Sequence, residues 1–309
     1  FNTQLQCTTV EGYGEQHRWK VTVKNADGTI SGQTLTTSTA ATFSYRRPKV
    51  ERILLPSQQN ITEAVVPTQG DILLSTSGGK VMIRGLDMGP LGLELTGEYG
   101  SEPTAGVAPS FYCAQCVVTK AHVEVECVAS AGGGKNMFWK LIGAGPTTGS
   151  VWSSPRNLDF TTSYSPPTIT SVAAVSTDSY LSTRGGTDIR IEGTSLGPTT
   201  HKRFLTCSGT NSELVPVVSG TDLVVTYGKT GSFPYSAENC RVVTNDQVVV
   251  CEAAAGTGFN HQVTLLLLGQ SSDVSASSLT YHPPTLLSVS GTGTKNVFSM
   301  IKKIKKEFK

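Results

Sequence analysis

The sequence predicts an all-β protein made of tandem two-sheet modules, and three observations support this. One phrase with the spacing C-x4-G-x-G occurs three times, beginning at Cys7, Cys127 and Cys251. The composition is rich in Gly, Ser, Thr and Val with only 16% charged residues, which favours short strands and turns over helices. Apolar residues alternate around paired cysteines, as in half-buried strands. Recurrence of one phrase at a nearly constant separation indicates an array of repeated units.

The repeats divide the chain into four parts. Residues 1–46 hold only the C-terminal half of a module, with closing strands expected at 19–23 and 41–45. Half a sandwich cannot cover its own apolar face, so we expect that the parent protein continues N-terminally or that another chain supplies the missing strands. Residues 47–165 and 166–282 are complete modules. Residues 283–309 are the start of a further repeat followed by a basic tail.

Each complete module is expected to be a series of short strands. In the first, strands are predicted near 50–53, at 91–95, in a hairpin over 116–127 and around 139; in the second, they are predicted at 189–191, 203–206, 223–226 and 263–268. Short proline-containing linkers close the repeats at Tyr45-Arg-Arg-Pro48, Tyr164-Ser-Pro-Pro167 and Tyr281-His-Pro-Pro284. Because proline restricts the backbone, neighbouring modules should meet at a fixed angle.

Two pairs of cysteines have the same spacing and predict disulfides. Cys116 and Cys127 are eleven residues apart, and so are Cys240 and Cys251. An odd spacing around a two-residue turn places the two cysteines opposite each other, and a bridge forms if the Cα atoms lie within about 6 Å. The sequence leaves the pairing of Cys7, Cys113 and Cys207 open, and a Cys113–Cys207 bridge across two modules is one option.

The cysteine pairs favour an oxidising compartment, and we therefore expect an extracellular or cell-surface location. Asn60-Ile61-Thr62 is an acceptor triplet for N-glycosylation in a stretch that reads as a loop, so attached glycans are expected at Asn60. The sequence has no apolar run of the length needed to span a membrane. It begins at Phe1 without a signal peptide, which is typical of an internal or processed fragment.

The charge is distributed unevenly. The formal net charge is +2, but residues 295–309 carry six Lys and one Glu, or +5, which leaves 2 − 5 = −3 on the remainder. A weakly acidic body gives no reason to expect nucleic acid as a partner. The tail places apolar residues on one helical face and Lys opposite, so it would lie on an anionic membrane or in a partner groove, or else remain a solvated terminus. The sequence leaves membrane contact open.

We find no catalytic, cofactor-binding or metal site in the sequence, so the chain is expected not to be an enzyme. Gly193-Thr-Ser195-Leu-Gly197 matches the nucleophile elbow G-x-S-x-G, but the corresponding phrase Gly85-Leu-Asp87-Met-Gly89 has no serine, so a structural turn explains both. Cys113 and Cys116 form a C-x-x-C pair, but Cys116 already belongs to the repeat pattern and no second such pair exists.

The order of these motifs resembles the IPT/TIG domain family. Each complete repeat begins with Pro and spaced apolar residues, followed by a Ser/Thr-x-Gly-Gly phrase and a turn that ends in Gly-Pro. The cysteine hairpin, the C-x4-G-x-G phrase and a closing Tyr before Pro come next. The Gly-Gly phrases are Gly78-Gly79 and Gly185-Gly186, and the Gly-Pro phrases are Gly89-Pro90 and Gly197-Pro198. The resemblance covers the chain to about residue 294. It implies tandem immunoglobulin-like β-sandwiches that act, outside the cell, as non-enzymatic spacers and partner-binding surfaces. The repeats are longer than is typical of the family, chiefly through loops near 97–112 and 208–238, and no binding residue is carried over.

The main functional hypothesis is therefore a structural or adhesive segment of a long extracellular surface or filament protein. Its partners would be proteins, above all other copies of itself or neighbouring chains of an assembly. One alternative is a receptor ectodomain whose long loops bind a protein ligand. A second is a set of accessory modules of a larger secreted enzyme.

Overall fold

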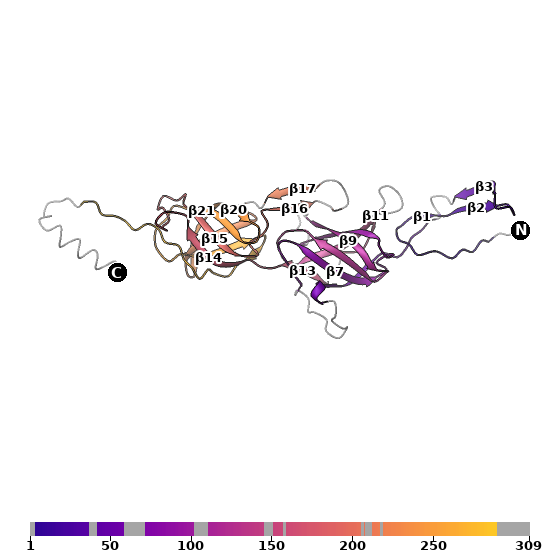
Figure 1. Ribbon diagram of the computed structural model, residues 1–309, viewed down its shortest axis with the longest axis horizontal. Coiled ribbons are helices and arrows are strands. Elements are labelled where there is room, and N and C mark those ends of the chain that lie inside the picture. Colours follow the sequence, from indigo (N-terminus) through magenta and orange to yellow (C-terminus); the bar gives the residue numbers. More distant parts are fainter. Residues whose placement is uncertain are drawn as a thin grey trace.

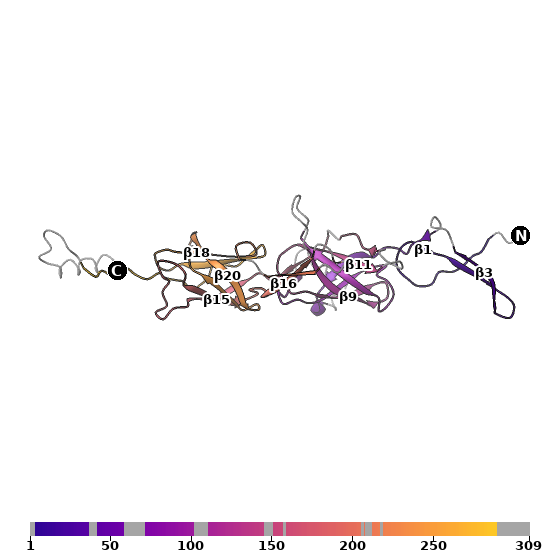
Figure 2. The same cartoon turned by 90° about the horizontal axis from the view of Figure 1, so that it is seen from above.

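The computed structural model shows an all-β chain whose parts follow one another along a single axis (Figure 1). It describes residues 4–36, 42–58, 72–101, 111–144, 151–156, 159–204, 207, 212–216 and 219–288. We name residues 4–46 the first unit, 47–165 the second module and 166–282 the third module. Seen from above, the same parts remain in line, with the first unit at the end near the N-terminus (Figure 2). The predicted glycosylation site Asn60 and the basic tail 295–309 lie outside the described residues.

The first unit contains two separate strand pairs. Its strands are β1 (His17–Arg18), β2 (Lys20–Lys24), β3 (Ile30–Thr36) and β4 (Thr42–Phe43). β1 pairs with β4 and β2 pairs with β3, both antiparallel. The predicted strand at 19–23 is present with a shift of one residue, and of the predicted strand at 41–45 only Thr42–Phe43 forms a strand. Ile30 in β3 is exposed, and so are Leu5 and Val10 in the segment before β1, because no second layer covers them among the described residues.

The second module is one hydrogen-bonded sheet that folds over its own core. Its strands are β5 (Lys49–Leu54), β6 (Ile72–Leu74), β7 (Gly79–Leu86), β8 (Glu94–Gly100), β9 (Tyr112–Lys120), β10 (Glu124–Ala129), β11 (Met137–Ala144), β12 (Val151–Ser153) and β13 (Thr161–Tyr164), with the 3-10 turn η1 (Pro56–Gln58). The strand order is β5-β7-β10-β9-β8-β11-β13-β6, with β12 beside β11. β9 joins the two halves of the sheet because it pairs with β10 on one side and β8 on the other.

The third module repeats this arrangement with the sheet divided in two. Its strands are β14 (Thr168–Ala174), β15 (Asp188–Thr194), β16 (Thr200–Phe204), β17 (Ser212–Pro216), β18 (Leu223–Lys229), β19 (Ser232–Ser236), β20 (Glu238–Thr244), β21 (Val248–Glu252), β22 (Gln262–Leu267) and β23 (Gln270–Ser271). The sheets are β14-β15-β21-β20 and β19-β18-β22-β23, with β16-β17 as a separate hairpin. β19 and β20 together take the place of β9, since one pairs with β18 and the other with β21.

Each module buries its own apolar core between its layers. The second module's core surrounds Trp139, Tyr99 and Cys127, and the third module's core surrounds Val263, Tyr227 and Cys251. Cys127 lies opposite Val81 and Cys116 in the ladder, and Cys251 lies opposite Ile189. Both signature cysteines are fully buried, so the repeated phrase marks equivalent positions in the two modules. The prediction of an all-β fold is confirmed, and the several packed sheets are consistent with the β-sandwich class.

Two local predictions were wrong. Residues 91–95 do not form a strand throughout, because Gly92 has a φ of 79° and the amide of Leu93 donates to Pro90 O at 3.1 Å, which closes a turn. β8 therefore begins only at Glu94. The segment 208–238 is not simply a loop, because it contains β17, β18 and β19.

Candidate functional site at the joints between modules

The signature phrase forms the same turn in all three copies, and in the first two copies this turn lies at the end of the unit that faces the following module. The second glycine of the phrase has a positive φ, which glycine adopts without steric cost: Gly14 (100°), Gly134 (113°) and Gly258 (109°). Its carbonyl accepts a hydrogen bond of 2.9 Å from the amide of the closing tyrosine: Tyr45 to Gly14, Tyr164 to Gly134 and Tyr281 to Gly258. In each unit this bond joins the turn to the segment directly before the linker.

The hydroxyl of the closing tyrosine makes a further hydrogen bond, to a carbonyl of the signature phrase. Tyr164 Oη donates to Ser130 O at 2.7 Å and lies 2.9 Å from Tyr99 Oη. Tyr281 and Tyr45 donate to the corresponding carbonyls, Ala254 O and Val10 O, each at 2.8 Å. Burial raises the pKa of both Tyr99 and Tyr164 well above the usual value for tyrosine. These hydroxyls therefore remain neutral hydrogen-bonding groups at all physiological pH values.

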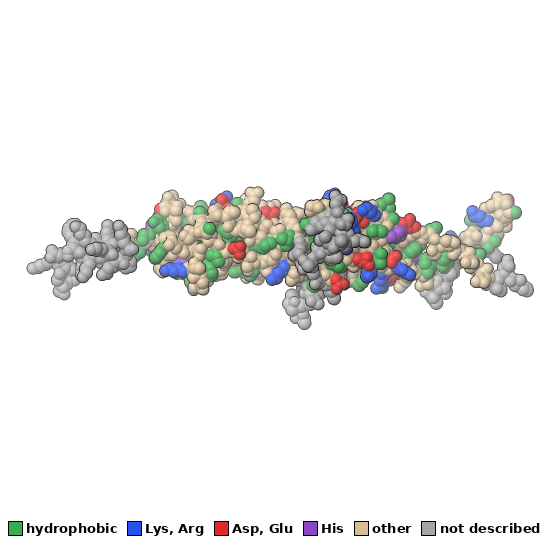
Figure 3. Space-filling model, turned by 90° about the horizontal axis from the view of Figure 1, so that it is seen from below, with side chains coloured by type: hydrophobic (Ala, Val, Ile, Leu, Met, Phe, Trp, Pro, Cys, Tyr) green, Lys and Arg blue, Asp and Glu red, His purple; other side chains and the backbone are tan. Residues whose placement is uncertain are grey.

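The first joint, between the first unit and the second module, rests on hydrogen bonds and ion pairs. Trp152 Nε1 donates to Arg46 O in the linker at 3.1 Å, and the Trp152 ring lies 5.8 Å from that of Tyr13. Arg47 pairs with Glu15 at 2.6 Å. At the turn between β9 and β10, His122 Nε2 lies 2.6 Å from Glu11 Oε1 of the first unit, a pair that carries opposite charges only when the histidine is protonated. Figure 3 shows charged side chains gathered on this part of the second module.

The second joint, between the second and third modules, uses equivalent positions with different residues. Gln270 takes the place of Trp152: its Nε2 donates to Tyr164 O at 2.8 Å, and its Oε1 accepts from the amide of Gly134 at 3.2 Å. Asp246 has the place of His122 and accepts a hydrogen bond from Thr76 Oγ1. Leu268 packs on Gly133 so closely that a Cβ there would lie 2.7 Å from it. Both joints thus use the β9–β10 or β20–β21 turn of the following module, together with Trp152 of β12 at the first joint and the β22–β23 hairpin at the second.

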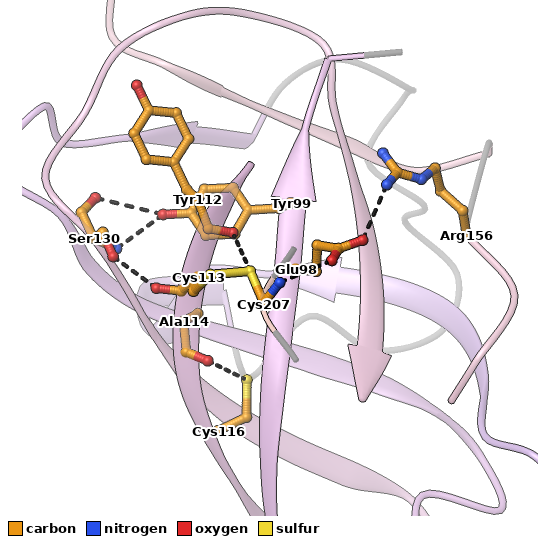
Figure 4. The surroundings of a disulfide bond; sticks show 9 residues. All are labelled: Glu98, Tyr99, Tyr112, Cys113, Ala114, Cys116, Ser130, Arg156 and Cys207. Atoms are coloured by element: carbon orange, nitrogen blue, oxygen red, sulfur yellow. Dashed lines mark hydrogen bonds and ion pairs between the residues drawn. A yellow bond between two sulfur atoms is a disulfide. The ribbon is translucent and has the colours of Figure 1, made fainter. Parts of the chain in front are cut away.

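The second joint has an additional connection that the first joint lacks in the described residues. The β16–β17 hairpin of the third module extends back to the second module, where Phe204 and Phe111 exchange two backbone hydrogen bonds of 2.8 and 2.9 Å. A disulfide joins Cys113 in β9 to Cys207 just after β16, with a Cα–Cα distance of 5.6 Å (Figure 4). The two modules are therefore linked covalently at two places, the linker and this disulfide.

A buried ion pair supports the disulfide from the second module. Glu98 is nearly fully buried, and its Oε2 accepts a hydrogen bond from the amide of Cys207 at 3.2 Å. Its Oε1 pairs with Arg156 at 3.2 Å, and the Arg156 guanidinium carbon lies 4.5 Å from the centre of the Phe111 ring. A buried carboxylate is costly unless it is paired, and here it has both a cation and an amide donor. Figure 4 shows Glu98 between Cys207 and Arg156.

The structure also contains the disulfides Cys116–Cys127 and Cys240–Cys251, each with a Cα–Cα distance of 4.0 Å. Cys7 is a free, exposed cysteine. The two residues of the C-x-x-C pair belong to different disulfides and do not act together. Three disulfides within one chain are typical of proteins from an oxidising environment.

The hydrolase-like phrase is a turn between two strands. Ser195 has a φ of 55°, and its counterpart Asp87 has a φ of 56°. β15 precedes Ser195 and β16 follows it, whereas a nucleophile elbow requires a helix after the serine. In the described part of the chain, no three His, Cys, Asp or Glu side chains lie together so as to hold a metal ion. Within the same residues, no helix has the length and apolarity to cross a lipid bilayer.

A cavity of about 460 Å³ lies beside the second joint. The signature turn of the second module and the β22–β23 turn of the third module both line it, through Gly133, Lys135 and Leu268. It therefore belongs to the joint already described.

Sequence reasoning missed most of the residues that build the joints. Gln270, Glu98 and Arg156 carry no motif, and Trp152 and Gln270 are chemically unlike although they occupy the same position. Only the unassigned cysteines Cys113 and Cys207 signalled a contact between modules. Compared with models of known protein families and with curated proteins, the sequence gives no match.

Proposed function

We propose that this chain is a semi-rigid, non-enzymatic spacer segment of an extracellular or cell-surface protein, built from tandem immunoglobulin-like modules of the IPT/TIG type. It works through protein–protein contacts, with other copies of itself or neighbouring chains of an assembly as partners. The order of sequence motifs supports the family, and the matching strand orders of the second and third modules agree with it. The three disulfides support an oxidising location.

The observation that carries the proposal is the repeated construction of the joint. In both joints a side chain of the following module bonds a backbone carbonyl at the end of the preceding unit: Trp152 to Arg46 O and Gln270 to Tyr164 O. Adjacent domains joined by a simple linker are expected to move relative to each other unless their interface is extensive. Such bonds restrict the angle between neighbouring units, most strongly at the second joint, and a spacer requires that restriction.

The proposal is tested by measuring the distance between modules in solution. Spin labels attached to p-acetylphenylalanine at the exposed positions Val128 and Val243 report on the second joint, and labels at Lys20 and Val128 report on the first. Double electron–electron resonance should give one narrow distance distribution for the Val128–Val243 pair. A broad distribution that spans many separations would show that the modules move independently, and the spacer function would be rejected.

A further inference from the structure

The three disulfides differ in how far solvent reaches their cysteines. Cys113 and Cys207, which join the second and third modules, are both partly exposed. Thiol–disulfide exchange requires a thiolate to reach one of the two sulfur atoms, so access governs its rate. The disulfide across the second joint is therefore the one that a reductant reaches first. The four cysteines of the other two disulfides are each at most 5% exposed: Cys116, Cys127, Cys240 and Cys251.

The two buried disulfides are enclosed by the cores of their modules. The Cys116 sulfur lies so close under β8 that a Cβ placed on Gly97 would be 3.0 Å from it. Cys240 and Cys251 belong to the apolar core of the third module. A reductant reaches such sulfur atoms only after local unfolding, and opening a core strand costs up to the full free energy of unfolding of the module.

The geometry of β9 keeps the two kinds of disulfide apart after reduction. Successive side chains of a strand point to opposite faces, and Cys113 and Cys116 are three residues apart. Cys116 points into the core with Ala114, whereas Cys113 shares the outer face of the strand with the exposed Gln115. The strand itself therefore separates a Cys113 thiolate from the disulfide of Cys116, and the folded module prevents exchange between them.

The second joint keeps other contacts when its disulfide is open. Phe204 and Phe111 are joined by two backbone hydrogen bonds, and the amide of Cys207 donates to Glu98. These bonds do not involve sulfur, so they hold the two thiols near each other. A high effective concentration of one thiol beside the other favours re-formation of the same pair. With the disulfide open, the linker is the covalent connection between the modules, and the joint opens more readily.

We propose that the Cys113–Cys207 disulfide is a redox lock of the second joint. A dithiol reductant opens it in the folded protein, leaves the two buried disulfides intact and widens the range of angles between the second and third modules. A small-molecule disulfide such as oxidised glutathione closes it again. This inference rests on the spacer function, because it makes the stiffness of that spacer adjustable.

Opening takes two exchange steps. A thiolate of the dithiol attacks the sulfur of Cys113 or Cys207, a new S–S bond to the reductant forms, the Cys113–Cys207 bond breaks, and the other cysteine leaves as a thiolate. The second thiolate of the reductant then attacks its own sulfur in this mixed disulfide, so that the reductant leaves as an internal disulfide and the second cysteine is released. Two electrons pass from the dithiol, which is oxidised, to the protein disulfide, which is reduced. The two cysteine thiolates take up the two protons that the dithiol has lost.

The test follows reduction of the folded 309-residue chain by dithiothreitol. The Cys7→Ser variant is used, so that the free thiol takes no part in exchange. Thiols are alkylated at successive times and located by mass spectrometry of peptides. We expect Cys113 and Cys207 to be alkylated at least about ten-fold faster than the four buried cysteines, because reduction of those requires local unfolding. In urea above the unfolding transition, all three disulfides should be reduced at similar rates.

A distance measurement shows what reduction does to the joint. Gadolinium labels, which thiols do not reduce, are attached through p-acetylphenylalanine at Val128 and Val243. The Val128–Val243 distance distribution should broaden when the Cys113–Cys207 bond is open, and it should narrow again after dithiothreitol is replaced by oxidised glutathione. With Cys113→Ala/Cys207→Ala added, the distribution should be broad from the start and should not respond to dithiothreitol.

Equal rates of reduction for the three disulfides in the folded chain would overturn the lock. So would a Val128–Val243 distribution that stays unchanged while the Cys113–Cys207 bond alone is open. In both cases a narrow distribution in the oxidised chain leaves the spacer function standing. A distribution that is already broad in the oxidised chain would instead reject the spacer function, and the lock with it.

Discussion

The two joints occupy equivalent places but are held by different chemistry. The first joint relies on one indole hydrogen bond and on ion pairs at the surface, such as Arg47–Glu15 and His122–Glu11. The second joint has a doubly bonded glutamine, a backbone bridge and a disulfide. Surface ion pairs contribute little and weaken with salt, whereas a disulfide does not depend on salt.

This difference indicates where the chain should bend. The second and third modules should move as one body, while the first unit should change its angle to the second module more freely. The β16–β17 hairpin accounts for most of the contrast, because in the second module the corresponding connection between β7 and β8 spans only residues 87–93 and has no hairpin. The second and third modules thus form a rigid pair, and the joint between the first unit and the second module is the more flexible one.

The largest effect is expected from alkaline pH, which acts on the closing tyrosine of the second joint. The pKa values of Tyr164 and Tyr99 are raised in the folded second module because both hydroxyls are buried. The two tyrosines therefore make their full contribution to the free energy of unfolding below pH 10, and this contribution is lost as the pH rises above the usual pKa of tyrosine. Above pH 10 the free energy of unfolding should therefore fall as the pH rises, by up to about 1.36 kcal/mol per pH unit for each tyrosine. Urea unfolding at several pH values measures this fall in the free energy of unfolding.

The double variant Tyr99→Phe/Tyr164→Phe supplies the control for this titration. It should have lower stability at neutral pH, since the hydrogen bonds of both hydroxyls to Ser130 and to each other are lost, but its stability should fall less steeply above pH 10. If the free energy of unfolding falls with pH as steeply in this variant as in the unchanged protein, other groups cause the loss of stability above pH 10.

Removal of the disulfide across the second joint should have the next largest effect. The double variant Cys113→Ala/Cys207→Ala should lose roughly 2–4 kcal/mol of stability, because a closed loop of 94 residues becomes open in the unfolded chain. The Val128–Val243 distance distribution should broaden toward that of the first joint. The matched control is Cys240→Ala/Cys251→Ala, which removes a disulfide inside the third module and should leave that distribution narrow. If both variants broaden it equally, the disulfide across the joint has no special role.

Gln270→Ala should weaken the second joint by about 1–2 kcal/mol, since two hydrogen bonds between modules are lost. The amide of Gly134 loses its acceptor, so its hydrogen exchange should become faster. Gln262→Ala is a suitable control, because Gln262 Nε2 bonds Ser275 O within the third module. Faster exchange at Gly134 in both variants would point to general loosening of the third module.

Trp152→Phe should weaken the first joint by about 1 kcal/mol. The change removes the donor to Arg46 O but keeps an aromatic ring beside Tyr13. The Lys20–Val128 distance distribution should broaden while the Val128–Val243 distribution stays the same. Trp139→Phe removes an indole bond to Thr162 Oγ1 inside the second module and should leave both distributions as they are.

The sequence predicts the modules far better than the joints. Cys127 and Gly134 recur at constant offsets because every module needs the same buried cysteine and the same positive-φ turn. Joint residues meet only when two modules are folded and aligned, so they show no periodicity. Trp152 and Gln270 occupy equivalent strand positions but bond carbonyls one residue apart, that of Arg46 just after the closing Tyr45 and that of the closing Tyr164 itself, and only the structure shows their equivalence. The sequence predicted a strand at 203–206, which overlaps β16, but it gave no sign of β17 or of the contact with Phe111, because Phe111 belongs to another module.

The smallest effect is expected for the ion pair between Glu11 and His122. Glu11→Gln should change the stability of the first joint by less than about 1 kcal/mol, because both side chains are largely exposed. The effect should be visible at low salt and should disappear near 1 M salt, where the Debye length is about 3 Å. Glu192→Gln, which removes a similarly exposed pair with Arg190 inside the third module, should leave the Lys20–Val128 distribution unchanged at any salt concentration. If Glu11→Gln broadens that distribution even at high salt, then Glu11 holds the joint by direct hydrogen bonding, and the first joint is less dependent on charge than the comparison of the two joints implies.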